Sequence, residues 1–275
     1  MVIADLFLAG IGAGLFAMAL IPGFVPGMVI GILLVMAGAG FLLADLSRRQ
    51  AAWRLLARPQ SSWVSRGTIG NLSFAVLAAA HIVNLVIRSD NWTSLGAPWV
   101  AGQTGSMVLA ILAGVAALFV ASYTGFLLGN MRAIPLWNSA YIPALFLVSA
   151  LLGGLGLVYL FPLNWNMLPW ALSLMQDLGI VLVVIELFLL LAVIGLTHSA
   201  TTRESVRLFT HGALRPHFMI GLFGIGLIVP LILLALVRVG AGSVVLMPAA
   251  GALLVIGMFL SRYIITKAGM HVSPV

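Results

Sequence analysis

The chain has 275 residues, of which 63% are hydrophobic and 7% are charged, and its mean hydropathy is +1.21. A soluble domain of this length cannot bury so much apolar surface, so the composition excludes a soluble globular protein. The net charge of +7 comes from basic residues between apolar runs, which does not indicate nucleic-acid binding, and a protein without cysteine cannot ligate an iron–sulfur cluster by thiolate or form a disulfide.

Eight continuous apolar runs follow one another along the sequence. A transmembrane helix requires about 20 apolar residues, and helices satisfy their own backbone groups in lipid. We therefore expect an all-α integral membrane protein with eight transmembrane helices, a single membrane domain over residues 1–275. Spans one to four and five to eight are expected to form two four-helix bundles. The spans are expected at about 3–22, 27–47, 68–88, 105–129, 139–161, 168–197, 217–238 and 243–266.

The first run has no basic region before it and no small-residue cleavage site after it, so we interpret it as a retained span and not as a signal peptide. Its glycines Gly10, Gly12 and Gly14 leave a smooth face, which favours close contact with another helix.

The connection between spans two and three is the longest polar segment. Basic residues alternate there with Trp53 and Trp63, a pattern typical of an amphipathic segment on lipid headgroups. The same pattern suits a docking surface for an acidic partner, and both interpretations stay open. The arginines concerned are Arg48, Arg49, Arg54, Arg58 and Arg66.

The basic residues of the loops also predict the orientation. With eight spans, connections two, four and six share one side with both termini. That side holds ten basic residues, whereas the other holds Arg88 and Arg238, so the termini are expected to be cytoplasmic. The ten are Arg48, Arg49, Arg54, Arg58, Arg66, Arg132, Arg203, Arg207, Arg215 and Lys267.

Ionisable residues inside spans are expensive and are functional candidates by default. Asp5 begins span one, Asp45 ends span two and Tyr123 lies near the end of span four, so the helix count brings all three to the terminus side. A simpler interpretation is that Asp5 lies at the water boundary, and that Asp45 pairs with the neighbouring arginines.

A second group comprises Asp177, Glu186 and Arg262. Glu186 lies near the centre of span six, and Asp177, nine residues earlier, is about 13 Å away along a helix. Arg262 in span eight is able to pair with either carboxylate. The group is either a structural ion pair or a proton relay.

His81 is the only histidine well inside a span. A di-haem cytochrome b needs paired axial histidines on facing helices, so haem is not expected in this protein. We interpret His81 as a hydrogen-bonded packing residue.

The segment from Ser122 to Gly156 carries the closest resemblance to a known family. Several stretches of the sequence are similar to NrfD/PsrC-type membrane subunits of polysulfide-reductase-like complexes. They are SYTGFLLG and IPLWN in this segment, LFLAGIGAG in span one, DLSRRQ and RPQSSWVSRG in connection two, and IELFLLL, PHFMIGLFGIGLIVPL and SRYIITKAG in the later spans. The resemblance implies a haem-free, eight-helix quinone-reactive subunit. Such a subunit lies beneath an iron–sulfur subunit that serves a molybdopterin catalytic subunit.

The resemblance also implies roles for individual residues. Tyr123 matches the tyrosine that binds the quinone carbonyl, and Asp45 matches an acid at the end of helix two. Asp5 stands where the family often has a histidine. Polysulfide-reductase types hold their site on the outer face, whereas the charge count here places it on the cytoplasmic face, as in sulfite-dehydrogenase-like relatives.

The main hypothesis is therefore a membrane anchor and quinone-reactive subunit in a prokaryotic inner membrane. It is not catalytic alone, and it exchanges electrons between menaquinone or ubiquinone and a ferredoxin-like iron–sulfur partner, docked on the arginines of connection two. The expected quinone-binding residues are Tyr123, Asp45, Asp5, Trp63 and Ser62. The alternative is a proton- or ion-translocating subunit that uses Asp177, Glu186 and Arg262.

Overall fold

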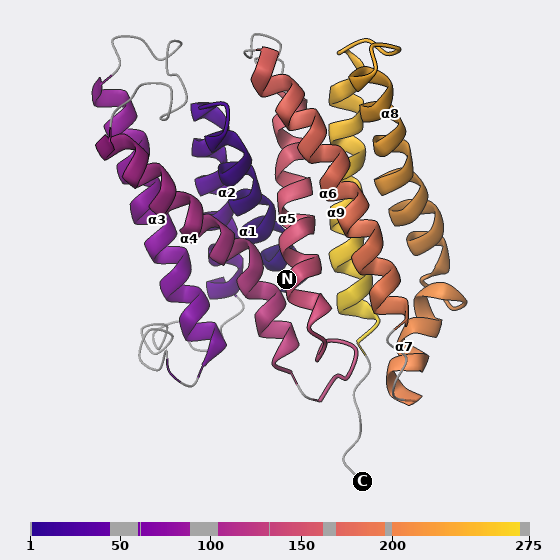
Figure 1. Cartoon of the computed structure of the whole chain (residues 1–275). Helices are drawn as coiled ribbons and strands as arrows, with labels where there is room; N and C mark the ends of the chain where they lie inside the picture. The colour runs from indigo at the N-terminus through magenta and orange to yellow at the C-terminus, as the bar shows by residue number, and fades with distance from the viewer. Residues whose placement is uncertain are drawn as a thin grey trace.

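The computed structural model describes residues 2–44, 60, 62–88, 104–131, 133–161, 169–195 and 200–269. Its regular elements in these ranges are all helices, and eight spans among them are long and apolar enough to cross a membrane, as expected. The helices lie roughly side by side with alternating direction (Figure 1). The α4–α5 connection, helix α7 and the end of α9 lie together at the lower end of that view.

Seven of the spans are single α-helices. The remaining span, the seventh in chain order, consists of a π-helix followed by an α-helix, and the short helix α7 precedes it. The bounds are α1 Val2–Leu20, α2 Val25–Ala44, α3 Trp63–Arg88, α4 Thr104–Gly129, α5 Tyr141–Leu160, α6 Pro169–Gly195, α7 Ala200–Thr210, the π-helix η3 His217–Ile228, α8 Val229–Arg238 and α9 Leu246–Lys267.

Two elements differ from the expected boundaries. Helix α3 begins at Trp63 and not at 68, so Trp63 and Arg66 belong to the span and not to a loop. Helix α7 was not expected, because its polar sequence does not resemble a span. It buries one face through Val206 and Phe209 and leaves its charged residues on the other.

The described residues form two core clusters, in agreement with the expected pair of bundles. One draws mainly on α1 to α4 and the other mainly on α5 to α9, and α1, α4 and α5 contribute to both. These two helices are in backbone contact: a Cβ at Gly14 would meet the Ala150 carbonyl, and one at Gly154 would meet the backbone of Gly14 and Leu15. Gly14 of α1 and Gly154 of α5 therefore let the two bundles pack together.

The seventh span continues from η3 into α8 without a break. The wider π-helical hydrogen bonding continues to Val229, whose N–H donates to the Gly224 carbonyl, and α8 begins at this residue, directly before Pro230. Gly226 packs directly on Gly257 of α9, which brings the two backbones together. The proline therefore follows a change of helix type and not a gap in the helix.

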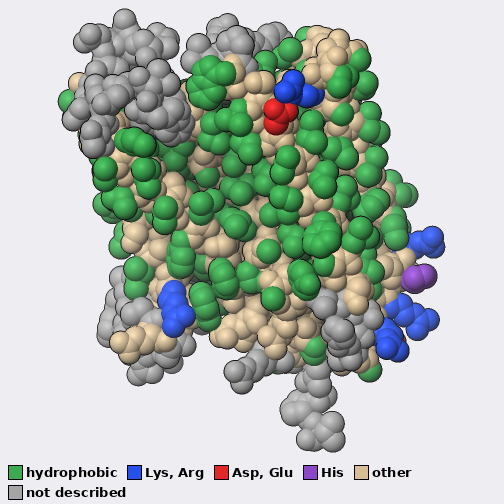
Figure 2. All heavy atoms as spheres, in the orientation of Figure 1, with side chains coloured by type: hydrophobic (Ala, Val, Ile, Leu, Met, Phe, Trp, Pro, Cys, Tyr) green, Lys and Arg blue, Asp and Glu red, His purple; other side chains and the backbone are tan. Residues whose placement is uncertain are grey.

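The outer surface is suited to lipid. Figure 2 shows hydrophobic side chains over the middle of the visible face and charged side chains near its two ends. Large apolar residues with exposed side chains include Leu72, Val76, Val115 and Phe188, on α3, α4 and α6.

Candidate functional site

Tyr123 lies in the second-last turn of α4 and is 3% exposed. Its ring rests on Gly67 of α3, where a Cβ would collide with the ring carbons. One turn away, the Phe119 ring rests on Gly70 in the same manner. The two glycines thus let α3 approach α4 closely enough to enclose the phenol.

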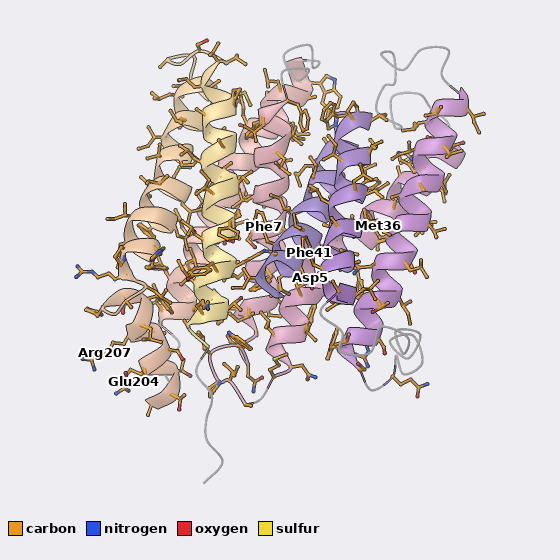
Figure 3. The ribbon with its side chains drawn as sticks, turned by 180° about the vertical axis from the view of Figure 1, so that it is seen from behind. Asp5, Phe7, Met36, Phe41, Glu204 and Arg207 are labelled. Carbon is orange, nitrogen blue, oxygen red and sulfur yellow. The ribbon has the colours of Figure 1, made fainter. Side chains whose placement is uncertain are left out.

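Three polar groups interact with the Tyr123 hydroxyl. The Asn71 side chain of α3 lies within hydrogen-bonding reach of it, and the charges of Asp5 and Arg262 act on it. Asn71 is buried and its carbonyl oxygen Oδ1 has no partner among the described residues. Asp5 is 5% exposed and lies at the start of α1, which packs against α2 (Figure 3). Asp5 is therefore packed within the protein and not exposed on its surface.

Aromatic rings cover the seam between α3 and α4 beside this site. Trp63 and Phe126 stack with centroids 5.4 Å apart and planes 5° apart. The Arg66 guanidinium lies over the Trp63 ring at 4.7 Å and donates to the Gln60 carbonyl at 2.8 Å. Because Phe126 is 42% exposed and lies one turn from Tyr123, the stack borders both lipid and the site.

Ser62, Asp45 and the docking arginines complete the set of predicted site residues. Ser62 accepts a hydrogen bond from the Ser65 backbone N–H at 3.4 Å, at the start of α3. Asp45 and four of the five predicted docking arginines, Arg48, Arg49, Arg54 and Arg58, lie outside the described residues.

Arg262 is 1% exposed and lies where α1, α5 and α9 meet. It donates hydrogen bonds to the backbone carbonyl of Leu6 and, at 3.1 Å, to that of Phe146, whose ring it also covers at 5.0 Å. Gly10 leaves the space for the guanidinium, because a Cβ there would collide with it. The glycine-rich first helix thus serves packing and also accommodates a buried cation.

Glu186 of α6 is fully buried beside this arginine. Its Oε1 accepts a hydrogen bond from the Ser261 hydroxyl at 3.3 Å, and its Oε2 has no partner among the described residues. Arg262 follows Ser261 in α9 and interacts electrostatically with Glu186, Tyr123 and Asp5. Arg262 therefore connects the two groups of residues that the sequence suggested separately.

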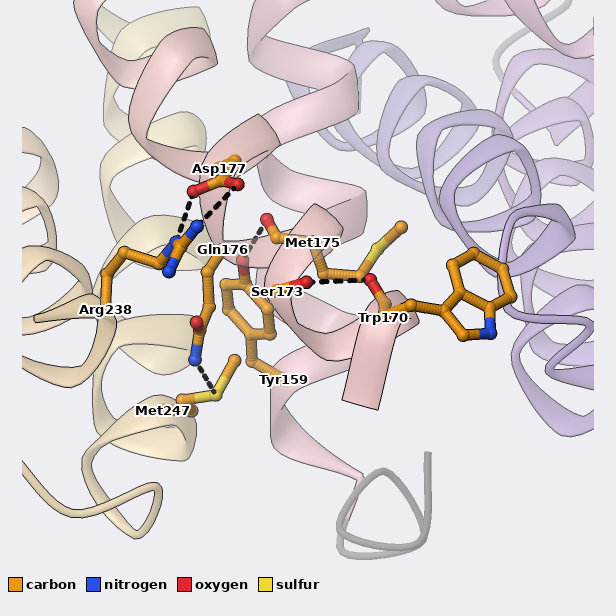
Figure 4. Close-up of polar contacts among 8 residues, drawn as sticks. All are labelled: Tyr159, Trp170, Ser173, Met175, Gln176, Asp177, Arg238 and Met247. Atoms are coloured by element: carbon orange, nitrogen blue, oxygen red, sulfur yellow. Dashed lines mark hydrogen bonds and ion pairs between the residues drawn. The ribbon is translucent and has the colours of Figure 1, made fainter. Parts of the chain in front are cut away.

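Asp177 does not join this group. It forms an exposed ion pair with Arg238, with 2.6 Å between the Arg238 Nε and an Asp177 carboxylate oxygen (Figure 4). Nearby, the Tyr159 hydroxyl donates to the Met175 carbonyl at 2.7 Å and fixes α5 against α6. Arg238 was counted from sequence only as a loop charge, so its role as the partner of Asp177 was missed.

The connection between α4 and α5 is tied to the end of α9. The Trp137 indole N–H donates to the Ile265 carbonyl at 2.8 Å, and the indole ring packs on Gly269. This contact fixes the turn that follows the Tyr123 helix.

The expected hydrogen bond of His81 is not found. The ring is fully buried in α3, but neither nitrogen has a partner among the described residues. No group of three or more His, Cys, Asp or Glu residues in the described part of the protein is arranged to hold a metal ion.

Sequence reasoning missed Asn71, Gly67 and Ser261. Gly67 and Asn71 are four residues apart and so share one helical face, and an amide inside an apolar run was the available signal. Ser261 carried no signal, because a serine in a span most often bonds its own helix.

Comparison with known proteins gives consistent matches over nearly the whole length. A family model described as Polysulphide reductase, NrfD matches residues 1–274. The chain is 28% identical to Protein NrfD of Escherichia coli strain K12 over 302 residues, covering 96% of this sequence and 92% of that protein. It is 30% identical to the C subunit of polysulfide reductase from Wolinella succinogenes over 296 residues, covering 96% and 91%. The chain therefore belongs to the polysulphide reductase NrfD family of membrane proteins.

Proposed function

We propose that this protein is the membrane anchor and quinone-reactive subunit of a multi-subunit oxidoreductase. The observation that carries the proposal is the buried Tyr123 phenol, with the Asn71 amide in reach and the Asp5 carboxylate nearby, beside an aromatic seam open to lipid.

The residues present fit a quinone. A quinone offers two carbonyl oxygens on a flat apolar ring, and both the Tyr123 hydroxyl and the Asn71 amide donate hydrogen bonds. Gly67 and Gly70 let α3 pack closely on the Tyr123 and Phe119 rings, which holds the phenol in place, and the Trp63–Phe126 stack gives an aromatic path from lipid. When bound, a quinone supplies two-electron, two-proton redox chemistry. In this proposal Tyr123 orients a carbonyl oxygen and Asp5 exchanges protons with the site.

The partners follow from the same proposal. The name of the Wolinella succinogenes relative makes that protein one component of a larger enzyme, polysulfide reductase. By analogy, we propose that electrons pass between the quinone site and a ferredoxin-like iron–sulfur subunit, which serves a molybdopterin catalytic subunit. The partner would dock at the arginine-rich end, on the cytoplasmic side of a prokaryotic inner membrane. The quinone is menaquinone or ubiquinone.

The test is Tyr123→Phe in the assembled complex. Loss of one hydrogen bond of about 1–1.5 kcal/mol weakens quinone binding roughly tenfold, so the apparent KM for quinone rises while assembly is unchanged. Tyr141→Phe is the matched control, because Tyr141 lies at the start of α5 and is 36% exposed. Unchanged quinone affinity and turnover in Tyr123→Phe would remove this residue from the site.

A second candidate function, proton translocation, is favoured by one observation: Glu186 is fully buried near Arg262, and its Oε2 has no partner in the described part of the chain. It rests on these two residues, because Asp177 is paired with Arg238. Glu186→Gln separates the possibilities. Normal electron transfer with lost proton movement supports coupling, and no effect on either process ends it. Ion flux through liposomes that hold this protein alone would instead indicate an independent transporter.

A further inference from the structure

Helices α3 and α4 carry a second set of buried polar groups, toward the opposite end of the bundle from Tyr123. His81 is fully buried with both ring nitrogens unpartnered among the described residues. Asn84, one turn further along α3, has a buried side-chain nitrogen without a partner there. The Ser106 hydroxyl of α4 is likewise buried and unpartnered within the described ranges.

The packing of the two helices puts these three residues at one level. The contacts of Gly67 with Tyr123 and of Gly70 with Phe119 show that α3 and α4 run antiparallel in close register. Extending this register along the helices places Ser106 opposite Asn84, within about one residue. His81 and Asn84 are three residues apart and so are neighbours on the surface of α3.

The chemistry of the set selects its ligand. A neutral imidazole has one donor and one acceptor nitrogen, the Asn84 nitrogen donates, and the Ser106 hydroxyl does both. A cation would satisfy only the acceptors, and a carbonyl compound only the donors. Water does both, and ordered water is the usual partner of buried polar groups that lack a protein partner.

We propose that His81, Asn84 and Ser106 bind a small cluster of ordered water molecules. Asn84 lies four residues before the end of α3, and Ser106 lies two residues after the start of α4. Asn84 is therefore only about 6 Å from the end of α3 and Ser106 only about 3 Å from the start of α4, measured along the helix axes, which gives water a short route to the site.

This water site is separate from the Tyr123 site. Phe74 and Ala78 are fully buried on α3 between Asn71 and His81, and the Phe74 ring packs edge-on against Phe16 at 5.0 Å. An apolar layer thus divides the two polar groups. The imidazole exchanges protons with water from the far membrane side, whether or not a quinone binds at Tyr123.

The test is hydrogen–deuterium exchange at the C2 carbon of the histidine rings, read by mass spectrometry of the full-length protein in lipid nanodiscs. This exchange requires water at the ring. We expect exchange at His81 at a rate comparable to that of the exposed His211, while the backbone amides of the same α3 segment stay protected.

The double variant Asn84→Leu/Ser106→Ala removes two of the four unpartnered atoms, and the two that remain are the ring nitrogens of His81, which point in different directions. A water at either nitrogen then has one of these partners, below the two to four that a buried water needs. Exchange at His81 should then slow by roughly tenfold. Ser122→Ala is the control, because its hydroxyl already donates to the Phe119 carbonyl at 3.1 Å. Three outcomes would overturn the proposal. They are no exchange at His81, exchange at His81 only together with loss of backbone amide protection, and an unchanged exchange rate in the double variant. The unaltered protein decides the first two outcomes even where the double variant does not fold.

Discussion

Replacing Gly154 by alanine tests the contact between α1 and α5. The added Cβ would lie against the backbone of Gly14 and Leu15, and neither backbone atom can rotate away as a side chain would. Ordinary carbon contacts need about 3.5–4.0 Å, so the two helices must separate by at least about 1 Å. A gap of this size forfeits up to about half of the dispersion attraction between the atoms across it.

The expected net loss follows from two opposing terms. Overpacking of this kind costs about 1–3 kcal/mol or more, while alanine gains up to about 1 kcal/mol over glycine in a helix. Because the collision is with backbone on both sides, we take the upper part of that range and expect Gly154→Ala to lose about 2 kcal/mol. Arg262 adds to the strain, since its hydrogen bonds to Leu6 and Phe146 bridge the same two helices.

Thermal unfolding of both variants in one detergent provides the measurement, with Gly40→Ala as the matched control. A Cβ at Gly40 of α2 meets nothing within 4 Å, so this variant should gain up to about 1 kcal/mol. The two variants should differ by about 3 kcal/mol, or roughly 6–12 °C in midpoint for a protein of this size. Equal midpoints would refute the inferred backbone contact.

Three further predictions concern other contacts. Gly67→Ala should push the Tyr123 ring from α3 and raise the apparent KM for quinone roughly tenfold, with assembly unchanged; an unaltered KM would contradict the proposed site. Asp177→Asn should cause a small loss of thermal stability that disappears in high salt, because the pair with Arg238 is exposed, and quinone turnover should not change. Trp137→Phe should cost about 1 kcal/mol through its lost hydrogen bond to α9, measured as faster amide exchange in the α4–α5 connection; unchanged exchange there would show that the bond does not fix the turn.

The eight spans could be predicted from sequence because membrane crossing depends on a local quantity, the length of an apolar run. The start of α3 and the whole of α7 could not. Both stretches mix arginines with apolar residues, and whether such a segment is helical depends on what its apolar face packs against. The prediction of two bundles followed from the count of spans, while the seam between α1 and α5 emerged only from the packing.

The partners of the charged residues were the hardest to foresee. Sequence analysis identified Asp5, Glu186 and Arg262 as the unusual charges, and the structure brings them together. Contacts between helices depend on the rotation and depth of each helix, which hydropathy does not encode. For that reason the partner of Asp177 was missed, and Asn71 was not connected with Tyr123.

The hydrogen bonds of Arg262 end on main-chain oxygens, and this has a consequence for how the contact evolves. Every amino acid supplies a carbonyl, so substitutions at positions 6 and 146 leave the acceptors in place. Methods that search for correlated substitutions will therefore find no signal that links position 6 to 262, and at position 146 only the contact of the ring with the guanidinium leaves one. The position where they should find a signal is 10, where any residue larger than glycine would displace the guanidinium of Arg262.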